Sequence, residues 1–256
     1  SVIGIAREAA AILPRFGRKA YLKDREWKIP YIKKNKLTLN LSDEKNLSDR
    51  ILAVIFEGVT IKKSPEYIVK RLEAAGIRSL NNLVDITNYV MLEIGHPTHV
   101  FDYDKIGTSE MIFRKAKRGE RITTLDNKSY ALYGGEVVID DGSGRIIDLP
   151  SIMGTANSVV HPESKRIIFF IDNVNPQLIR KASMSHGIRT LAATYNEKRP
   201  DPEFGYKALL RAVDLIHELA SPASMSEIID LYPRPVKPKK IKITPDFITT
   251  RVGVNI

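Results

Sequence analysis

The apolar run Ile167–Ile171, which lies between Arg166 and Asp172, places the strongest limit on what this chain can fold into. Consecutive large apolar side chains suit a strand that is buried on both faces, because every residue then meets a protein interior. A helix that crosses a bilayer needs roughly 20 apolar residues, and no stretch of the sequence comes near that length. We therefore expect a globular chain with no membrane span, in which this run forms a fully buried strand.

Helix signals and strand signals follow one another in irregular order along the rest of the chain. Start and stop residues such as Ser, Pro and Gly predict helices within residues 2–13, 64–76, 79–94, 176–186 and 202–219. Ser64 is expected to cap the second of these, and Leu80 to lie on the buried face of the third. Apolar patterns and turn residues predict strands in 37–41 and 51–61, a loop at 96–106, and hairpins within 112–147. This mixture favours an α+β fold with mixed or antiparallel sheets and packed helices over a doubly wound parallel sheet.

Positive charge is concentrated at the two ends of the chain. The net charge is +10; residues 1–40 carry +7, residues 231–256 carry +5, and the remainder carries −2. Either the ends contact a polyanion such as nucleic acid, or they are solvated linkers. We predict the end of a preceding module with a basic linker at 1–36, an α+β domain at 37–230, and a Pro- and Lys-rich linker with the start of a next module at 231–256. Both ends read as cut from a longer chain.

The residue types present exclude several kinds of chemistry. Cysteine is absent, so the chain has no disulfide, thiolate zinc site or cysteine nucleophile, which fits a cytoplasmic protein. The sequence contains no glycine-rich phosphate loop and no nucleophile elbow. His96, His99, Asp102 and Asp104 are grouped like metal ligands, but a His pair outside a helix has no fixed common face. We therefore predict no metal there, and expect the two aspartates to cap a turn or the next element.

A longer motif is more informative. Residues 72–95, continuing to His99–Asp102, closely resemble the editing domain of the bacterial phenylalanyl-tRNA synthetase beta subunit. Shorter matches follow in the same order, so that the resemblance covers essentially the whole chain, at 152–154, 176–180, 187–192, 197 and 201–202. The resemblance implies a fragment of that beta subunit, part of an aminoacyl-tRNA ligase, with an editing-type domain that hydrolyses tyrosine mischarged on phenylalanine tRNA.

The same resemblance implies partners and cofactors. In this family an alpha subunit activates the amino acid with ATP and magnesium, and two alpha and two beta subunits form a heterotetramer. We therefore expect no cofactor and no metal in this fragment, with ATP and magnesium needed only by the full complex. The expected partners are phenylalanine tRNA and the alpha subunit, with no membrane involved and a cytoplasmic location.

Positions in the family's motif assign a candidate editing pocket. The resemblance places in it Thr87, Asn88, His99, Gly154, Thr190 and Ala192. Asn and Thr can hold ribose or carbonyl oxygens, His99 can orient the terminal adenosine or a water, and Ala192 leaves room for an aromatic ring. The family has no obvious protein nucleophile, so a positioned water, aided by a tRNA hydroxyl, is expected to attack the ester. Glu197 and Asp201 are expected to be structural.

Three positions around that pocket depart from the family. Phe170 stands where the family has the Glu that recognises the tyrosine hydroxyl, and Thr155 and Arg199 each replace a glycine. An apolar wall discriminates poorly between tyrosine and phenylalanine. We therefore expect Phe170 to add to core packing and editing to be slow and weakly selective, unless Asp172 or Thr155 has taken over hydroxyl recognition. The alternatives are an editing-deficient scaffold and tRNA-binding module of the same synthetase, or an unrelated nucleic-acid-binding module suggested only by the basic ends.

Overall fold

The computed structural model describes residues 1–23 and 26–254. Residues 24–25 of the expected N-terminal linker, and residues 255–256 at the expected start of a next module, lie outside the described residues. Within the described part of the chain, no helix is both long enough and apolar enough to cross a membrane.

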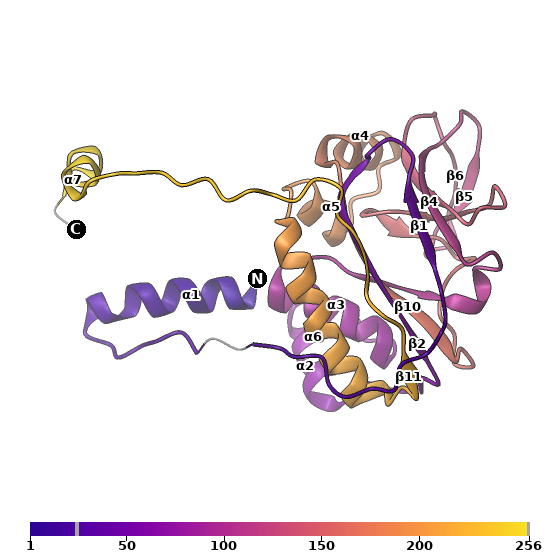
Figure 1. Ribbon diagram of the computed structural model, residues 1–256, viewed down its shortest axis with the longest axis horizontal. Helices are drawn as coiled ribbons and strands as arrows, with labels where there is room; N and C mark the ends of the chain where they lie inside the picture. Colours follow the sequence, from indigo (N-terminus) through magenta and orange to yellow (C-terminus); the bar gives the residue numbers. More distant parts are fainter. Residues whose placement is uncertain (24–25, 255–256) are drawn as a thin grey trace.

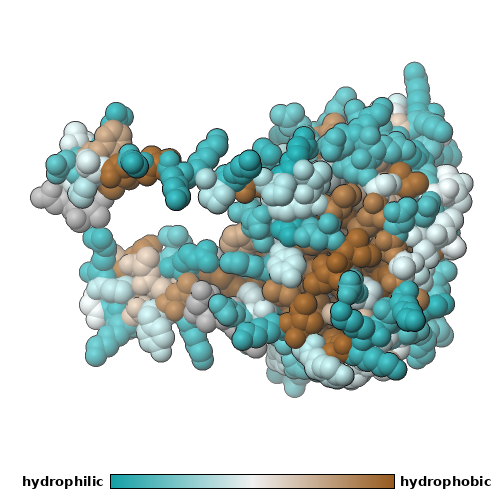
Figure 2. Space-filling view, in the orientation of Figure 1, coloured by the Kyte–Doolittle hydropathy of each residue, from teal (hydrophilic) through white to brown (hydrophobic). Residues whose placement is uncertain are grey.

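Two segments project from the folded body (Figure 1). α1 (Val2–Ile12) and the 3-10 turn η1 (Leu13–Phe16) form one of them. α7 (Pro245–Val252) lies at the far end of the other, which is an extended chain along most of its length. Figure 2 shows hydrophilic side chains along both projections, and apolar residues among them are largely exposed, for example Ile5 and Ile241. The projections therefore bury little apolar surface within this chain.

The first sheet is built around β10 (Arg166–Val174), which is the buried strand predicted from the apolar run. That prediction is confirmed. β10 pairs antiparallel with β2 (Ser48–Glu57) on one side and with β3 (His99–Asp102) on the other. β11 (Ser224–Met225) and β12 (Ile229–Leu231) pair antiparallel with the other edge of β2 and complete the sheet.

The second sheet has a mixed topology. In spatial order its strands are β1 (Asn40–Asp43), β4 (Glu110–Lys115), β7 (Val137–Asp140), β8 (Ile146–Leu149) and β9 (Met153–Gly154). β1 runs parallel to β4, and the other neighbours are antiparallel. β5 (Arg121–Thr123) and β6 (Ser129–Ala131) form a separate hairpin. Of the hairpins predicted within residues 112–147, β5–β6 and β7–β8 are confirmed. The turn at Gly134–Gly135 does not close a further hairpin, because β7 pairs with β4 and not with β6.

Three helices cover one face of the first sheet: α2 (Glu66–Ala74), α3 (Asn82–Ile94) and α6 (Pro202–Ala220). α3 ends where predicted, at Gly95, whose φ of 93° is in the left-handed region that glycine adopts without a Cβ clash. α4 (Pro176–His186) has the predicted bounds. No sequence pattern predicted the short α5 (Leu191–Asn196) that follows it.

The alternation of side chains along β10 separates two hydrophobic cores. Ile168 and Phe170 point between the two sheets, whereas Ile167, Phe169 and Ile171 point toward the helices. Both faces of the strand are therefore buried, which explains why the run contains no polar residue.

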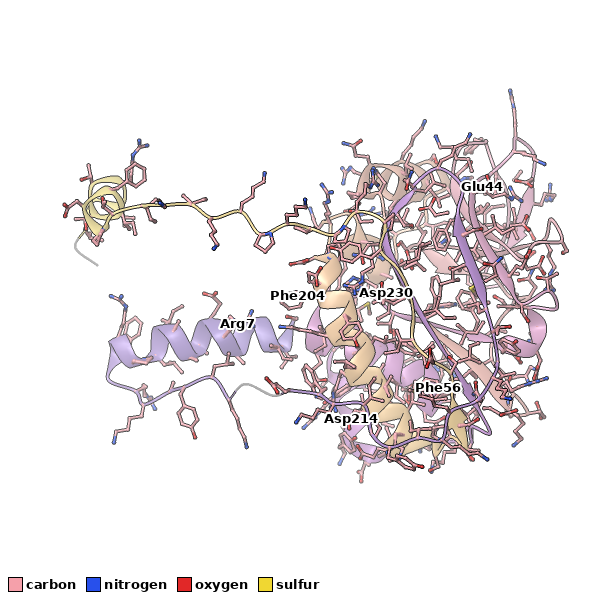
Figure 3. All side chains as sticks on the ribbon, in the orientation of Figure 1. Arg7, Glu44, Phe56, Phe204, Asp214 and Asp230 are labelled. Atoms are coloured by element: carbon pink, nitrogen blue, oxygen red, sulfur yellow. The ribbon has the colours of Figure 1, made fainter. Side chains whose placement is uncertain are left out.

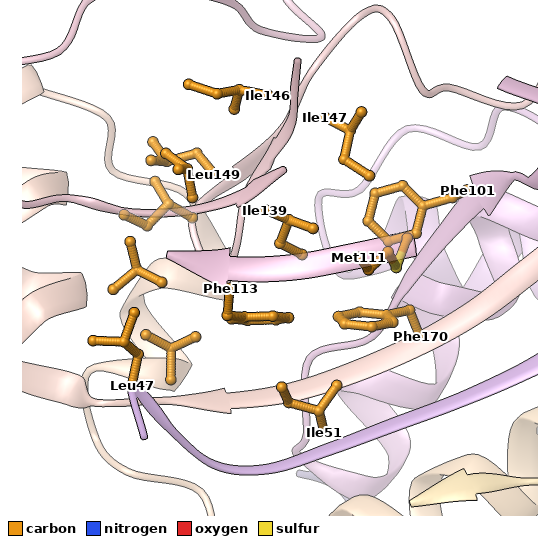
Figure 4. Close-up of a cluster of buried hydrophobic side chains, with 14 of the residues drawn as sticks. Leu47, Ile51, Phe101, Met111, Phe113, Ile139, Ile146, Ile147, Leu149 and Phe170 are labelled. Atoms are coloured by element: carbon orange, nitrogen blue, oxygen red, sulfur yellow. The ribbon is translucent and has the colours of Figure 1, made fainter. Parts of the chain in front are cut away.

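Phe170 lies at the centre of the core between the sheets. It is fully buried, stacks on Phe113 with ring centroids 6.0 Å apart, and meets Phe101 in a T-shaped contact at 5.5 Å. Figure 4 shows the rings of Phe113 and Phe170 side by side among aliphatic neighbours. The expected role of Phe170 in core packing is confirmed.

Two expectations about the helices are wrong. Ser64 does not cap α2, because its hydroxyl instead donates to Asp85 Oδ2 at 2.5 Å. Leu80 is 59% exposed, since α3 begins only at Asn82, after an N-cap at Asn81. Leu80 thus lies ahead of the helical periodicity that suggested its burial.

The segment 96–106 is not a loop throughout, as expected, because it contains β3 and a 3-10 turn, η2 (Tyr103–Lys105). Pairing with the distant β10 stabilises β3, so the local sequence alone gave a weak signal. The capping role expected for Asp102 is confirmed: its Oδ1 accepts a hydrogen bond from the Asp104 amide at 3.0 Å. The strand expected at 37–41 begins only at Asn40.

Candidate functional site

A small cavity opens where the ends of the two sheets meet α5. Its volume is about 60 Å³, which is room for a few water molecules. The start of β3, β8 and the turn after it, β10 and α5 all contribute to the lining. Of the candidate residues from the sequence, three line this cavity, namely His99, Gly154 and Ala192.

His99 and Gly154 are in close contact, and the missing side chain of Gly154 makes this contact possible. A Cβ placed on Gly154 would lie 2.8 Å from His99 Cε1 and 3.1 Å from His99 Nε2. Gly154 does not have a positive φ. Glycine is therefore required here for space and not for backbone conformation.

The His99 ring is held neutral. Burial lowers the pKa of His99 to about 4, so imidazole and not imidazolium faces the cavity at neutral pH. Its ring packs in a T-shaped contact on Phe101, with centroids 4.5 Å apart. A neutral imidazole can accept one hydrogen bond and donate another, which suits it to orient a water or a carbonyl group.

His96 has a different environment from His99. It is fully buried, with Nδ1 2.9 Å from Pro97 O and Nε2 3.0 Å from Asn173 Nδ2. Nδ1 therefore donates to the carbonyl, and Nε2 accepts from the amide. Among the residues described, no group of three or more His, Asp or Glu is placed to hold a metal ion.

Thr190 positions the α5 side of the cavity without lining it. Its hydroxyl oxygen accepts a hydrogen bond from the Ala193 amide at 3.0 Å, so Thr190 is the N-cap of α5. The same hydroxyl donates to Ile152 O at 2.6 Å. Thr190 thus joins the helix that carries Ala192 to the turn that leads into Gly154.

Replacing Thr190 with Ala is expected to lower the free energy of unfolding by about 1 to 2 kcal/mol, because an N-cap is lost and the Ile152 carbonyl loses its donor. Urea denaturation of the two proteins measures the difference. Thr190→Ser keeps the hydroxyl and is the matched control. Equal losses in both variants would show that the methyl group, and not the hydroxyl, is responsible.

The two candidates on α3, Thr87 and Asn88, do not line the cavity. The Thr87 hydroxyl donates to Val84 O of its own helix at 2.7 Å, while the Thr87 carbonyl accepts from Thr98 Oγ1 at 3.2 Å. Thr98 lines the cavity, but the half-buried Asn88 does not. The structure therefore does not bring Asn88 and His99 together in this cavity.

Thr155 and Phe170 are also outside the lining. Thr155 is buried, and its Oγ1 lies 2.5 Å from Ile147 O, so its hydroxyl is used within the second sheet. Phe170 packs in the core between the sheets. Neither side chain presents a polar group to the cavity.

Glu197 and Asp201 have the structural roles expected from the sequence. Both carboxylate oxygens of Glu197 accept hydrogen bonds from the Arg189 guanidinium at 2.9 Å. Asp201 caps α6 by accepting from the Glu203 amide at 2.9 Å. Glu197 thus ties the C-terminal end of α5 to the residue before its N-cap, and Asp201 stabilises the start of α6.

Besides Thr98 and His99, the polar part of the wall includes Asp148, Ser151, Asp172 and Asn196. Burial raises the pKa of Asp172 to about 6. Burial, with the nearby negative charge of Asp172 as a second cause, raises the pKa of Asp148 well above its usual range. Asp172 carries a sequence signal, since it stands two residues beyond Phe170 and so shares its strand face. No such signal marks the other three residues.

A larger hollow of about 500 Å³ lies between the N-terminal segment and α6. Arg7 on α1 and Phe204 on α6 line it (Figure 3). None of the candidate residues from the sequence reaches it. The small cavity is therefore the candidate functional site.

The protein thus consists of two sheets packed on each other, with helices over one sheet and a cavity at their junction. The B3/4 domain model matches residues 47–221, and the chain belongs to this family. Over all of its length the chain is 35% identical to the phenylalanine–tRNA ligase beta subunit of Thermotoga maritima, and 36% and 37% identical to those of Geobacter metallireducens and Clostridium tetani. It spans 32% of the length of each of these relatives. The resemblance found in the sequence is thus confirmed.

A solved structure shares the fold. The chain is similar to an N-terminal fragment of the phenylalanyl-tRNA synthetase beta subunit from Pyrococcus horikoshii, with a TM-score of 0.50 and 15% identity. The match covers 90% of this chain and 64% of that fragment. The predicted α+β class is confirmed by this likeness and by the sheets and helices described above.

Proposed function

We propose that this chain is the editing part of a phenylalanine–tRNA ligase beta subunit, and that it hydrolyses the ester between mischarged tyrosine and phenylalanine tRNA. The observation that carries the proposal is the cavity where His99, Gly154 and Ala192 meet. These residues come from three distant parts of the sequence. The alpha subunit and phenylalanine tRNA are the proposed partners, with activation of the amino acid by ATP and magnesium left to the alpha subunit.

The proposed nucleophile is a water. Ser151 lines the cavity, but its hydroxyl donates to Asp172 and is not activated by His99. A base with a pKa of about 4 takes up protons poorly at neutral pH. His99 therefore orients the water or the ester carbonyl, and a tRNA hydroxyl next to the ester assists the attack, as the resemblance implies.

The distribution of charge supports tRNA as the substrate carrier. The net charges of +7 and +5 lie in the two terminal segments, whereas the residues between them carry −2. Basic segments attract a phosphate backbone at long range, and the near-neutral body leaves recognition of the 3′ end to specific contacts.

A second candidate function is a non-catalytic scaffold within the same synthetase. It is favoured by Phe170, which places an aromatic ring in the core at the position where the resembling family has its recognition Glu. It is also favoured by the exposed apolar residues of the two projecting segments, which suit contact with another chain or module. Hydrolysis of mischarged tRNA separates the two candidates.

Gly154→Ala in the complete synthetase is expected to slow hydrolysis of tyrosyl-tRNA by about tenfold or more, because the new Cβ displaces the His99 ring. The measurement is release of labelled tyrosine from preformed tyrosyl-tRNA. Gly107→Ala is the matched control, since Gly107 also lacks a positive φ and a Cβ there meets no atom within 4 Å.

Three results are informative. Loss of hydrolysis in Gly154→Ala with normal rates in Gly107→Ala supports the editing proposal. Hydrolysis that is equally fast in both variants contradicts the assignment of the site. A wild-type synthetase that does not hydrolyse tyrosyl-tRNA at all favours the scaffold.

A further inference from the structure

Two carboxyl groups form one end of the cavity. Asp148 and Asp172 come from β8 and β10, one strand from each sheet, and are 4% and 8% exposed. The Ser151 hydroxyl donates a hydrogen bond to Asp172 Oδ2. Within the described residues, no cationic side chain lies close enough to lower the pKa of either aspartate. The negative charge at this end is therefore not balanced by the protein.

Two acceptor atoms at the same place have no partner. Oδ1 of Asp148 and Oδ1 of Asn196 are buried, and no donor from the residues described reaches them. Asn196 is 3% exposed, and its Nδ2 donates to Ser151 O at 3.3 Å. Buried polar atoms in folded proteins are nearly always paired. A donor that enters from the cavity would pair with these acceptors.

We propose that Asp148, Asp172 and Asn196 form a receptor for a hydrogen-bond donor of the aminoacyl group, either its α-ammonium or a side-chain hydroxyl. The inference rests on the proposed function, and it names the residues that would recognise the amino acid. A negative, acceptor-rich wall repels the phosphates of the tRNA backbone. The cavity, with a volume of about 60 Å³, has room for such a small polar group.

The electrostatics of the two aspartates suit this role. Near neutral pH, Asp172 with a pKa of about 6 is mostly ionised, while burial and the nearby charge of Asp172 raise the pKa of Asp148 well above its usual range. The remaining negative charge is stabilised when a donor enters the cavity. The hydroxyl of Thr155, the other residue considered for hydroxyl recognition, already donates a hydrogen bond to Ile147 O. On this proposal, selectivity is retained although Phe170 replaces the family's Glu.

The test uses the complete synthetase with full-length beta subunits and four substrates: tyrosyl-tRNA and phenylalanyl-tRNA, each with a free or an acetylated α-amino group. The free-to-acetylated ratio of hydrolysis rates reports recognition of the ammonium, and the tyrosyl-to-phenylalanyl ratio reports recognition of the hydroxyl. We expect one ratio to be about tenfold or more in the wild type. Asp148→Asn and Asp172→Asn are each expected to reduce that ratio at least about fivefold.

Asp104→Asn is the matched control, because Asp104 forms a surface ion pair with Arg166 outside the cavity and its side chain is 43% exposed. It is expected to leave both ratios unchanged. If the Asn variants fail to fold, Ser151→Ala removes the hydroxyl donor of Asp172 and is expected to reduce the same ratio.

The outcomes separate this inference from the proposed function. A fall in the free-to-acetylated ratio in the Asn variants identifies the donor as the ammonium. A fall in the tyrosyl-to-phenylalanyl ratio identifies it as the hydroxyl. Active variants with unchanged ratios overturn the receptor while editing stands, and so does a wild type that hydrolyses all four substrates at similar rates. A wild type that hydrolyses none of them overturns the proposed function and the receptor together.

Discussion

Replacing Phe170 with Ala is expected to lower the free energy of unfolding by about 3 to 5 kcal/mol. The ring is fully buried and stacked on Phe113, with Phe101 against it. β10 is held by hydrogen-bonded strands on both sides. This pairing limits how far β10 and its neighbours can shift into the space that the missing ring leaves. Urea denaturation of the chain at neutral pH measures the loss.

Phe170→Leu is the control for this prediction. Leucine keeps most of the apolar volume, so its loss of stability is expected to be less than half that of the Ala variant. A loss below about 1 kcal/mol for Phe170→Ala would mean that the core between the sheets rearranges more freely than its pairing suggests.

Asp172→Asn is expected to raise the free energy of unfolding at neutral pH by about 3 kcal/mol. The pKa of Asp172 is about 6 in the folded chain because the carboxyl is buried, whereas an exposed Asp has a pKa near 3.9. The folded state therefore binds this proton more tightly than the unfolded state. Stability falls as pH rises from about 4 through the folded pKa, and the loss is complete above about pH 7.

The variant and the wild type should differ in a pH-dependent way. Asn cannot ionise, so the two proteins are expected to have similar stability below about pH 4 and to diverge as pH increases. Unfolding free energies measured by urea across this range provide the check. Asp104→Asn, at the surface, is expected to show no such divergence. A wild type that is as stable as Asp172→Asn above neutral pH would show that the ionised carboxyl does not destabilise the folded chain, and would contradict the prediction.

The buried carboxyl of Asp172 is expected to destabilise the folded chain near neutral pH. Such a cost fits a residue that is kept for binding. Functional sites commonly retain groups that the fold alone would replace. Asp172→Asn is thus expected to increase stability while it reduces recognition of the aminoacyl group. The two measurements together distinguish a functional carboxyl from a packing residue.

Elements with strong local signals could be predicted from the sequence. α4 has Pro176 at its start and Gly187 as its stop, and its bounds agree with the prediction. β10 is apolar on both faces and was identified for that reason. β3 and α5 could not be predicted, because both depend mostly on tertiary contacts. β3 has only four residues and pairs with the distant β10. α5 has only six residues and is capped by Thr190.

The candidate site could be predicted only in part. The motif led to His99, Gly154 and Ala192, which line the cavity, and to Thr190, which supports it. The carboxyl of Asp148 was not foreseen, because nothing in a single sequence shows that β8 ends next to β10. Such proximity between strands of different sheets is a property of the assembled fold.

The alternation along β10 also limits where a polar group that serves the cavity can be placed. Residues at even-numbered positions from 168 to 172 share one face, and neighbouring positions on that face are about 6.6 Å apart. On this strand an acidic side chain can therefore share the face of Asp172 at position 170 or 168, but not at 171. A substitution at 171 would direct the carboxyl into the helical layer. A search for related chains with an acidic side chain on this strand face therefore has to consider positions 170 and 172. A search restricted to position 170 would find only Phe170 here and would overlook Asp172.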